Sequence, residues 1–193
     1  MTSFDLYTAM LDTDILFPAG KRDIIIQPAV YDLYRPKWSI DVFREWMRID
    51  RRLRQDHDPA KVLNTQEQLN AFFFDALITD YEHLISGITL PDPGDRHVVA
   101  AAIQGGCDFI VTQNLDDFPA DVLNAFGIDV YSPDEFLLLL FEENEDAFLE
   151  SMRALLDKFR SPPYTLEQYL RMRTRDGLVG IAAELRKRGH LLR

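Results

Sequence analysis

The hydrophobic residues of this chain fall into short continuous runs separated by stretches of helical periodicity. Residues 8–12, 108–112 and 127–131 are mostly apolar runs followed by polar residues, which is typical of buried β-strands. Between these runs, apolar residues recur every three or four positions, which predicts amphipathic helices. Strands that alternate with helices predict an α/β fold, with a parallel β-sheet and helices on both of its faces.

The helix boundaries follow from capping residues. Ser39 is a good N-cap for a helix with apolar positions from Val42 onward. Ser132, Pro133 and Glu135 form a capping-box sequence with proline at the first helical position. Asp14 is placed to cap a helix after the first strand. We also expect a loop at 54–61 and a helix at 66–78. A strand is expected at 85–89, and a further helix is expected at 92–103, beginning at Asp92.

The composition changes at about Glu142, after which only helical patterns follow. Helices are predicted over 147–159, 165–174 and 177–187, with a break at Ser161-Pro162-Pro163. We therefore predict a first domain at 1–143, which carries the strands, and a C-terminal α-helical extension at 144–193.

The charge is distributed unevenly. The net charge is −11, but residues 151–193 carry +6 and the first 150 residues carry −17. An acidic body excludes binding of nucleic acid by bulk electrostatic attraction. The basic tail offers phosphate contacts for RNA, or it is the solvated face of a packing or dimerising helix pair. The candidate RNA-binding residues are Arg171, Arg173, Arg175, Arg186, Lys187 and Arg188.

Several classes of protein are disfavoured. No apolar run approaches the roughly 18 residues that a membrane span needs. The first residues lack the basic start of a signal peptide. A single cysteine, Cys107, excludes an internal disulfide framework and a cysteine-based metal site. We expect a cytoplasmic protein that does not interact with a membrane.

Four groups of acidic or amide residues lie where a strand is predicted to end or a helix to begin. Carboxylates that lie close together repel one another unless a cation or a proton joins them. If the fold gathers these groups, their oxygens form a site for a hard divalent metal, which indicates metal-assisted hydrolysis of a phosphodiester. The groups contain Asp12 and Asp14, Glu45, Asp92 and Asp95, and Asn114 to Asp117.

Each acid also has a structural interpretation. Asp14 and Asp92 are good helix caps, and we expect both to shape mainly the backbone. Glu45 could equally be an exposed helical glutamate, although it borders an apolar stripe. Asn114 and Asp117 follow a buried strand directly, a placement that favours function. Asp116 is expected to be solvated, and Phe118 to be buried in the core.

The quoted motifs resemble those of the PIN domain family of metal-dependent ribonucleases, in its branch of bacterial VapC-type toxins. The matching segments are Leu11 to Leu16, Trp38-Ser39 with Glu45, Pro91 to Ala102 and Ile110 to Phe118. The resemblance covers roughly residues 7–140. It implies an acidic pocket that binds Mg²⁺ or Mn²⁺, in which Asp12, Glu45 and Asp95 correspond to the three core acids.

The fourth position of the family pattern, often aspartate, is Asn114 here, with Asp117 nearby. An asparagine can coordinate through its carbonyl oxygen but contributes no charge. The resemblance therefore implies the catalytic residues Asp12, Glu45, Asp95, Asn114 and Asp117, of which all but Glu45 are expected metal ligands. It also implies an RNA substrate, a cognate antitoxin protein and a homodimer.

Two other functions remain open. The chain could be a catalytically weak PIN-like protein that acts mainly by binding an antitoxin or itself. Asp12 and Asp14 after a strand also suit the nucleophile and acid of an aspartyl phosphatase. That chemistry needs a lysine near the later motifs, and none lies between Thr112 and Asp117. The C-terminal residues resemble the helical extension of a larger subgroup of such toxins.

Overall fold

The computed structural model describes residues 6–53, 58–159 and 164–192. Its centre is a five-stranded parallel sheet with the strand order β3-β2-β1-β4-β5. The parallel sheet and its helices confirm the predicted α/β class. The strands are β1 (Thr8–Leu11), β2 (Arg35–Ser39), β3 (Leu77–Ile78), β4 (Phe109–Val111) and β5 (Asp129–Tyr131).

The central strand β1 is buried along most of its length. Ala9, Met10 and Leu11 are fully buried, because helices cover both faces of the sheet at this point. Ala9 lies opposite Pro36 of β2 and Phe109 of β4. This continuous burial explains why β1 and β4 are apolar runs instead of alternating patterns.

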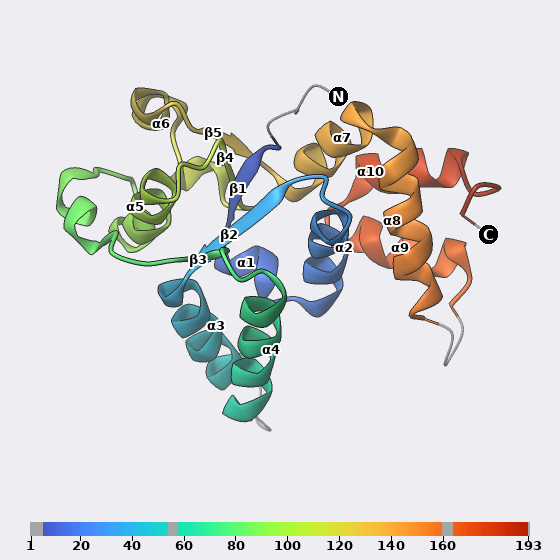
Figure 1. Cartoon of the computed structure of the whole chain (residues 1–193), viewed down its shortest axis with the longest axis horizontal. Helices are drawn as coiled ribbons and strands as arrows, with labels where there is room; N and C mark the ends of the chain where they lie inside the picture. Colours follow the sequence, from blue (N-terminus) through green and yellow to red (C-terminus); the bar gives the residue numbers. More distant parts are fainter. Residues whose placement is uncertain (1–5, 54–57, 160–163, 193) are drawn as a thin grey trace.

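Helices form a layer on each face of the sheet (Figure 1). On one face, α5 contacts β1, β2 and β4, whereas α2 and α7 contact strands from the opposite face. The helices that flank the sheet are α1 (Thr13–Leu16), α2 (Ala19–Val30), α3 (Ile40–Leu53), α4 (Pro59–Phe72), α5 (Arg96–Gln104), α6 (Ala120–Leu123) and α7 (Pro133–Glu143).

The C-terminal extension is a further layer of helices packed on that opposite face. It contains α8 (Glu145–Asp157), α9 (Leu166–Arg175) and α10 (Val179–Lys187). Helix α8 packs on α2, and α10 packs on α7 (Figure 1). The buried side chains of Phe148 and Leu170 belong to the same hydrophobic core as the sheet. The extension is therefore built onto the first domain; the predicted boundary at 143 stays a prediction.

Capping explains several boundaries as expected. Ser132 and Glu135 form the predicted capping box, with Pro133 at the start of α7. The hydroxyl of Ser39 accepts a hydrogen bond from the backbone N–H of Val42 at 3.4 Å, as an N-cap does. The prediction that Asp14 caps the first helix was wrong. Asp12 is the N-cap of α1, and its Oδ1 accepts from the backbone N–H of Thr13 at 2.6 Å.

Three sequence predictions in the middle of the chain were also wrong. The expected loop at 54–61 overlaps α4, which starts at Pro59 with Asp58 as its N-cap. Proline at the first turn begins a helix as readily as it marks a loop. The expected helix over 66–78 ends at Phe72, since 77–78 form β3. The expected strand at 85–89 is a 3₁₀ turn, Glu82–Gly87, with a second 3₁₀ turn at Pro93–Asp95.

The later helices match their predicted positions within a few residues. The expected break at 161–163 and the loop residues 54–57 lie outside the described residues. Two further 3₁₀ turns, Leu115–Asp117 and Asn124–Phe126, precede and follow α6. Phe118 is buried in the core, as predicted. In the described part of the chain, none of the helices is both long and apolar enough to cross a membrane.

Candidate acidic site at the carboxyl edge of the sheet

The strand order places two of the acidic groups at a reversal in the sheet. From β1 the chain continues outward to β2 and β3, and it then returns to the other side of β1 as β4 and β5. The loops after β1 and β4 therefore leave the sheet in different directions, and in parallel sheets ligands bind at the carboxyl ends of such a pair of strands. Asp12 follows β1, and Thr112 to Asp117 follow β4, so both groups lie at this position.

Asp12 is held firmly by its neighbours. It is buried, with 5% of its surface exposed. Its Oδ2 accepts a hydrogen bond from the hydroxyl of Thr112 at 2.8 Å, and its Oδ1 accepts from Thr13. Burial raises the pKa of the Asp12 carboxyl above its ordinary value, and these two hydrogen bonds oppose that shift. The carboxylate is thus fixed in orientation, and the charge of Glu45, which raises its pKa, acts on it more strongly than the charge of His97, which lowers it.

Glu45 points from α3 toward the same site. Its Oε2 accepts a hydrogen bond from the Thr13 hydroxyl at 2.7 Å, and its Oε1 lies 3.1 Å from His97 Nε2 of α5. Burial opposes its ionisation, but the hydrogen bonds with His97 and Thr13 outweigh burial, so the pKa of Glu45 lies below its ordinary value. Glu45 is therefore an ionised, oriented acceptor and not a freely solvated helical glutamate.

His97 is a residue of the site that the sequence argument did not single out. Burial lowers its pKa, but the hydrogen bond and the charge of Glu45 outweigh burial, so the pKa of His97 is raised. Its Nδ1 is buried and has no hydrogen-bond partner among the described residues. The only signal in the sequence was its position two residues after Asp95, at the start of α5.

Asp95 lies at the junction of the other acidic groups. It ends the 3₁₀ turn that leads into α5, and Asp92 caps that turn by accepting from the Gly94 N–H at 2.7 Å. Burial, followed by the charges of Asp12, Asp92, Asp117 and Glu45, raises the pKa of Asp95 to about 7. The carboxylates from β1, α3, α5 and the loop after β4 therefore lie within electrostatic range of one another.

The loop after β4 supplies the fourth corner of the site. The backbone N–H of Asn114 donates to the Thr112 hydroxyl at 3.1 Å, and Asn114 is exposed. Asp117 is half-buried, and its charge acts on Asp95. Asp116 is exposed, as expected for a solvated side chain. Of the two candidates in this loop, Asp117 is thus the one that is electrostatically coupled to the other acids.

Asp14 and Lys21 add a second group beside Asp12. Asp14 Oδ2 accepts from the backbone N–H of Gln113 at 2.9 Å, which ties α1 to the loop after β4. Burial and the charge of Asp12 raise the pKa of Asp14 to about 6. Lys21 of α2 is buried, and its charge acts on Asp14. Lys21 has no local signal in the sequence, because its helix α2 buries residues on several sides and has no single apolar stripe.

The oxygen atoms of the site fit a hard divalent metal. Asp14 Oδ1 is buried and lacks a hydrogen-bond partner within the described residues, and the neighbouring Asp12 is also buried. Carboxylate and amide oxygens are the ligands that Mg²⁺ and Mn²⁺ prefer. Across residues 6–53, 58–159 and 164–192, no three acidic, histidine or cysteine side chains form a ready-made metal cage. The acids are neighbours, but they are not a closed coordination sphere.

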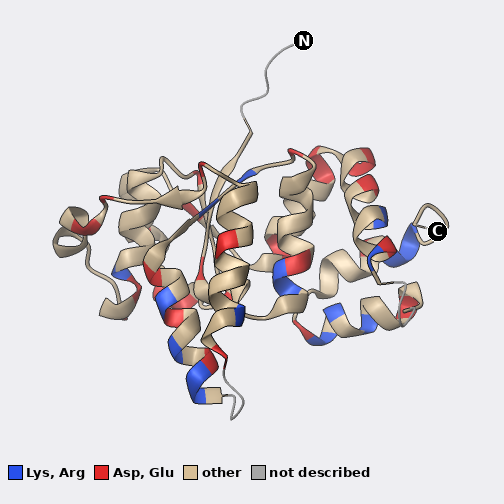
Figure 2. Ribbon diagram, turned by 60° about the horizontal axis from the view of Figure 1, so that its bottom comes forward, with Lys and Arg blue, Asp and Glu red and all other residues tan. Residues whose placement is uncertain are grey.

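The basic residues of the tail mostly have acidic partners within the chain. Figure 2 shows basic and acidic segments side by side in the C-terminal helices. Glu167 binds Arg171 and Arg186, Glu184 binds Lys187, and Arg188 binds Glu145. These contacts support the packing interpretation of the tail, and its role in RNA binding stays a prediction.

Arg173 and Arg175 differ from the other residues of the tail. Arg173 is buried, donates to the backbone oxygen of Gly20 and pairs with Asp176 at 2.9 Å. The backbone oxygen of Asp176 in turn accepts from the Gln113 side chain at 3.4 Å. Arg175 is exposed and has no partner in the described part of the chain. The extension therefore contacts the loop that carries Asn114.

Fold and site together define a class: an α/β protein with a cluster of coupled carboxylates at the reversal point of a parallel sheet. Comparison with protein families agrees. Residues 44–116 match a PIN domain model, and residues 133–187 match the model of the VapC50 C-terminal domain. The middle segment of the chain is thus similar to a PIN domain, and its C-terminal segment is similar to a VapC50 C-terminal domain.

One curated relative shares clear sequence similarity. The "Putative ribonuclease VapC50" of Mycobacterium tuberculosis (strain ATCC 25618 / H37Rv) is 39% identical over 71 residues, which are 37% of this chain and 42% of the relative. The aligned part thus spans less than half of the relative's length. No solved structure matches the chain significantly. The PIN match includes Glu45, Asp95 and Asn114, whereas Asp12 and Asp117 lie outside it.

Proposed function

We propose that the protein is a divalent-metal-dependent endoribonuclease, the toxin of a bacterial type II toxin–antitoxin pair. The observation that carries this proposal is the convergence of Asp12, Glu45 and Asp95 at one edge of the sheet, where Thr112 and Thr13 hold two of the three acids. The PIN domain match and the VapC50 relative support the same activity.

Asp12, Asp95 and Asp117 are the residues that would hold Mg²⁺ or Mn²⁺, with Asn114 as a neutral oxygen ligand at the rim. When bound, such an ion supplies a more acidic water and positive charge for the scissile phosphate. Without a cation, the cluster repels RNA, so metal binding and substrate binding are coupled.

Glu45 would orient the attacking water. Its lowered pKa keeps it ionised near neutral pH, so it can accept a hydrogen bond or a proton from water. His97 and Thr13 fix the carboxylate from two sides, which restricts it to one orientation. The Thr112 hydroxyl likewise fixes the orientation of the Asp12 carboxylate. It also accepts a hydrogen bond from the N–H of Asn114, which fixes the start of the loop after β4.

The decisive experiment is a titration of Mg²⁺ and Mn²⁺ into the full chain while cleavage of total RNA and tRNA is followed. Wild type should cleave only with metal, and Asp12→Asn and Asp95→Asn should abolish cleavage without loss of the fold. Asp116→Asn is a matched control, since it removes the same charge from an exposed position beside the site. Cleavage retained by both Asp12→Asn and Asp95→Asn would disprove the assignment.

The partners of a VapC-type toxin complete the proposal: an RNA substrate, a cognate antitoxin that inhibits the enzyme, a homodimeric state and a cytoplasmic location. The exposed side chains of Phe72 (61%) and Phe74 (90%) provide apolar surface for association with a protein. Sedimentation of the pure chain, alone and with the antitoxin, tests the assembly. A chain that binds the antitoxin but never cleaves RNA would favour the catalytically weak alternative.

The aspartyl phosphatase is less well supported. Asp14, the acid that this chemistry needs, is tied by hydrogen bonds to the loop after β4. Covalent labelling of Asp12 by a phosphate analogue would revive this alternative.

A further inference from the structure

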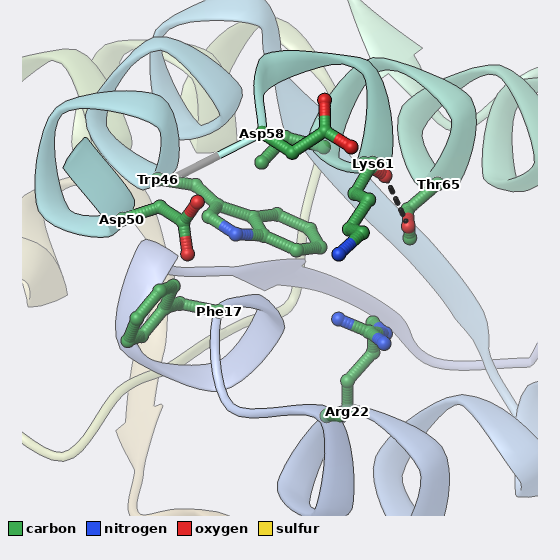
Figure 3. A pocket seen from close by; sticks show the side chains of 9 residues that line it. Phe17, Arg22, Trp46, Asp50, Asp58, Lys61 and Thr65 are labelled. Atoms are coloured by element: carbon green, nitrogen blue, oxygen red, sulfur yellow. Dashed lines mark hydrogen bonds between the residues drawn. The ribbon is translucent and has the colours of Figure 1, made fainter. Parts of the chain in front are cut away.

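A small cavity lies between the start of α2, α3 and α4. Its volume is about 150 Å³. Phe17 and Trp46 form its apolar wall, and Arg22 and Lys61 supply its positive charges (Figure 3). Phe17 follows the helix that Asp12 caps, and Trp46 follows Glu45 directly, so the cavity shares its supporting elements with the catalytic acids.

The two cations point toward each other from α2 and α4 (Figure 3). Like charges that face each other are unfavourable unless an anion joins them. Arg22 lies over the Trp46 ring, 5.0 Å from its centroid, and donates one N–H to the backbone oxygen of Leu16 at 2.9 Å. The side chain is only 16% exposed, so this guanidinium has limited access to water.

Most of the hydrogen-bonding capacity of this pair is unused. A guanidinium has five N–H donors, and the only carboxylate near Arg22 in the described chain, Asp23, is 3.9 Å away. Lys61 Nζ has no hydrogen bond or ion pair with any described residue. Burial lowers the pKa of Arg22, which is the expected result for a cation without a full set of partners.

The two carboxylates that line the cavity, Asp50 and Asp58, both have partners. Asp58 caps α4 and accepts from the Ala60 N–H at 3.0 Å. Asp50 is 4% exposed and has a partner of its own. Neither forms an ion pair with Arg22 or Lys61 within the described residues, so the cationic side of the cavity is free for a ligand.

The volume of the cavity limits the size of the ligand that it can bind. Pockets for whole drug-sized ligands have volumes of about 300–1,000 Å³, whereas this cavity holds about 150 Å³. A phosphate group fits such a space, and arginine with lysine is a common pair for binding one. The proposal rests on the ribonuclease function: we propose that Arg22 and Lys61 form a subsite for a backbone phosphate of the RNA strand that flanks the scissile phosphate.

The test uses the full chain and short oligoribonucleotides in which one phosphate at a time is replaced by a neutral methylphosphonate. With wild type, one flanking position should raise KM about tenfold, since a charge-assisted hydrogen bond contributes that much binding. Lys61→Gln should raise KM for the natural strand by a similar factor, leave kcat unchanged, and abolish the extra effect of that neutral position.

Arg52→Gln is the matched control, because it removes a positive charge from an exposed site of α3 that does not line the cavity. If Arg52→Gln and Lys61→Gln raised KM for the natural strand equally, bulk electrostatics would explain the effect, and the proposed subsite would be wrong. The proposed subsite would also be wrong if the methylphosphonate still raised KM at that position in the Lys61→Gln variant.

Affinity for an uncleavable 2′-O-methyl strand, followed by fluorescence anisotropy, separates the subsite from the proposed function. If the chain neither binds nor cleaves RNA, the ribonuclease proposal fails. If it cleaves RNA but Lys61→Gln changes neither KM nor affinity, only the subsite fails. Loss of binding to an acidic peptide segment of a protein partner, with RNA affinity unchanged, would assign the cavity to that partner instead.

Discussion

The acidic edge of the sheet and the C-terminal extension use charge in opposite ways. At the edge, Asp12, Glu45 and Asp95 gather from three elements, and burial with mutual repulsion raises the pKa of Asp95 to about 7. In the extension, charges of opposite sign meet, as in the contacts of Arg188 with Glu145 and Glu184. The first arrangement costs folding free energy, and the second is locally neutral.

This difference separates a candidate site from a packing surface better than the number of charged residues does. By composition, the basic tail was one candidate surface for RNA binding and also a candidate packing surface. Its cations mostly already have carboxylate partners, whereas the carboxylates at the edge outnumber the cations, such as His97 and Lys21, that act on them in the described part of the chain. A cation therefore gains the most binding free energy at the edge. We expect substitutions there to affect function most, and substitutions in the extension to affect mainly the stability of the fold.

The largest expected effect is on catalysis at the edge. Asp95→Asn should lower metal-dependent RNA cleavage by at least about a thousandfold, because it removes a ligand charge. The same substitution removes repulsion among buried carboxylates, so the free energy of unfolding in EDTA should rise by about 1 kcal/mol. Cleavage assays and urea denaturation measure the two effects. A clear loss of stability would mean that Asp95 stabilises the fold. The contrast between the acidic edge and the C-terminal extension would then be wrong.

The second effect concerns the buried arginine of the extension. Arg173→Met keeps most of the side-chain volume but removes the hydrogen bond to Gly20 and leaves Asp176 without its partner. The free energy of unfolding should fall by about 3 kcal/mol, as for other broken buried ion pairs. Arg175→Met in the same helix is the matched control, and as an exposed residue it should change stability by less than about 0.5 kcal/mol. Equal effects of the two substitutions would contradict the structural role of Arg173.

The third effect tests how the edge is preorganised. Thr112→Val is nearly isosteric but removes the hydroxyl that donates to Asp12 and accepts from the N–H of Asn114. Affinity for Mn²⁺ and the rate of cleavage should fall about 10- to 100-fold, which is typical when a group that orients a metal ligand is lost. Thr112→Ser keeps the hydroxyl and should restore most of the affinity. If serine and valine were equally poor, packing of the threonine methyl group and not its hydroxyl would be responsible.

Much of the fold could be predicted from the sequence because its strands are simple. Strands β1 and β4 are short apolar runs, and Ser132 with Glu135 marks the start of α7 without any tertiary information. Helix α2 could not be recognised in the same way. Its buried residues include Lys21, Ile24 and Gln27, since the sheet and α8 cover it on different sides, and this leaves no single apolar stripe.

The acids of the candidate site could be selected from their positions at strand and helix ends, but their partners could not. His97 and Glu45 are 52 positions apart, and Thr112 and Asp12 are 100 positions apart. Such pairs form only through the tertiary fold, so no local pattern reveals them. The same holds for Arg173, whose contact with Gly20 turns an apparently basic surface residue into a buried one.

The smallest expected effect tests the remaining role of the tail in RNA binding. Each phosphate contact on a single strand contributes about 0.7 to the slope of log affinity against log salt. Arg175→Gln should lower this slope by about 0.7, because Arg175 has no acidic partner among the described residues. Arg171→Gln should change it less, since Glu167 already neutralises that guanidinium at 3.1 Å. Anisotropy titrations of an uncleavable strand at several salt concentrations provide the measurement. If the slopes of both variants equal that of wild type, the tail makes no phosphate contact through these residues. It is then a packing surface, in contrast to the acidic edge, for which we propose ligand binding.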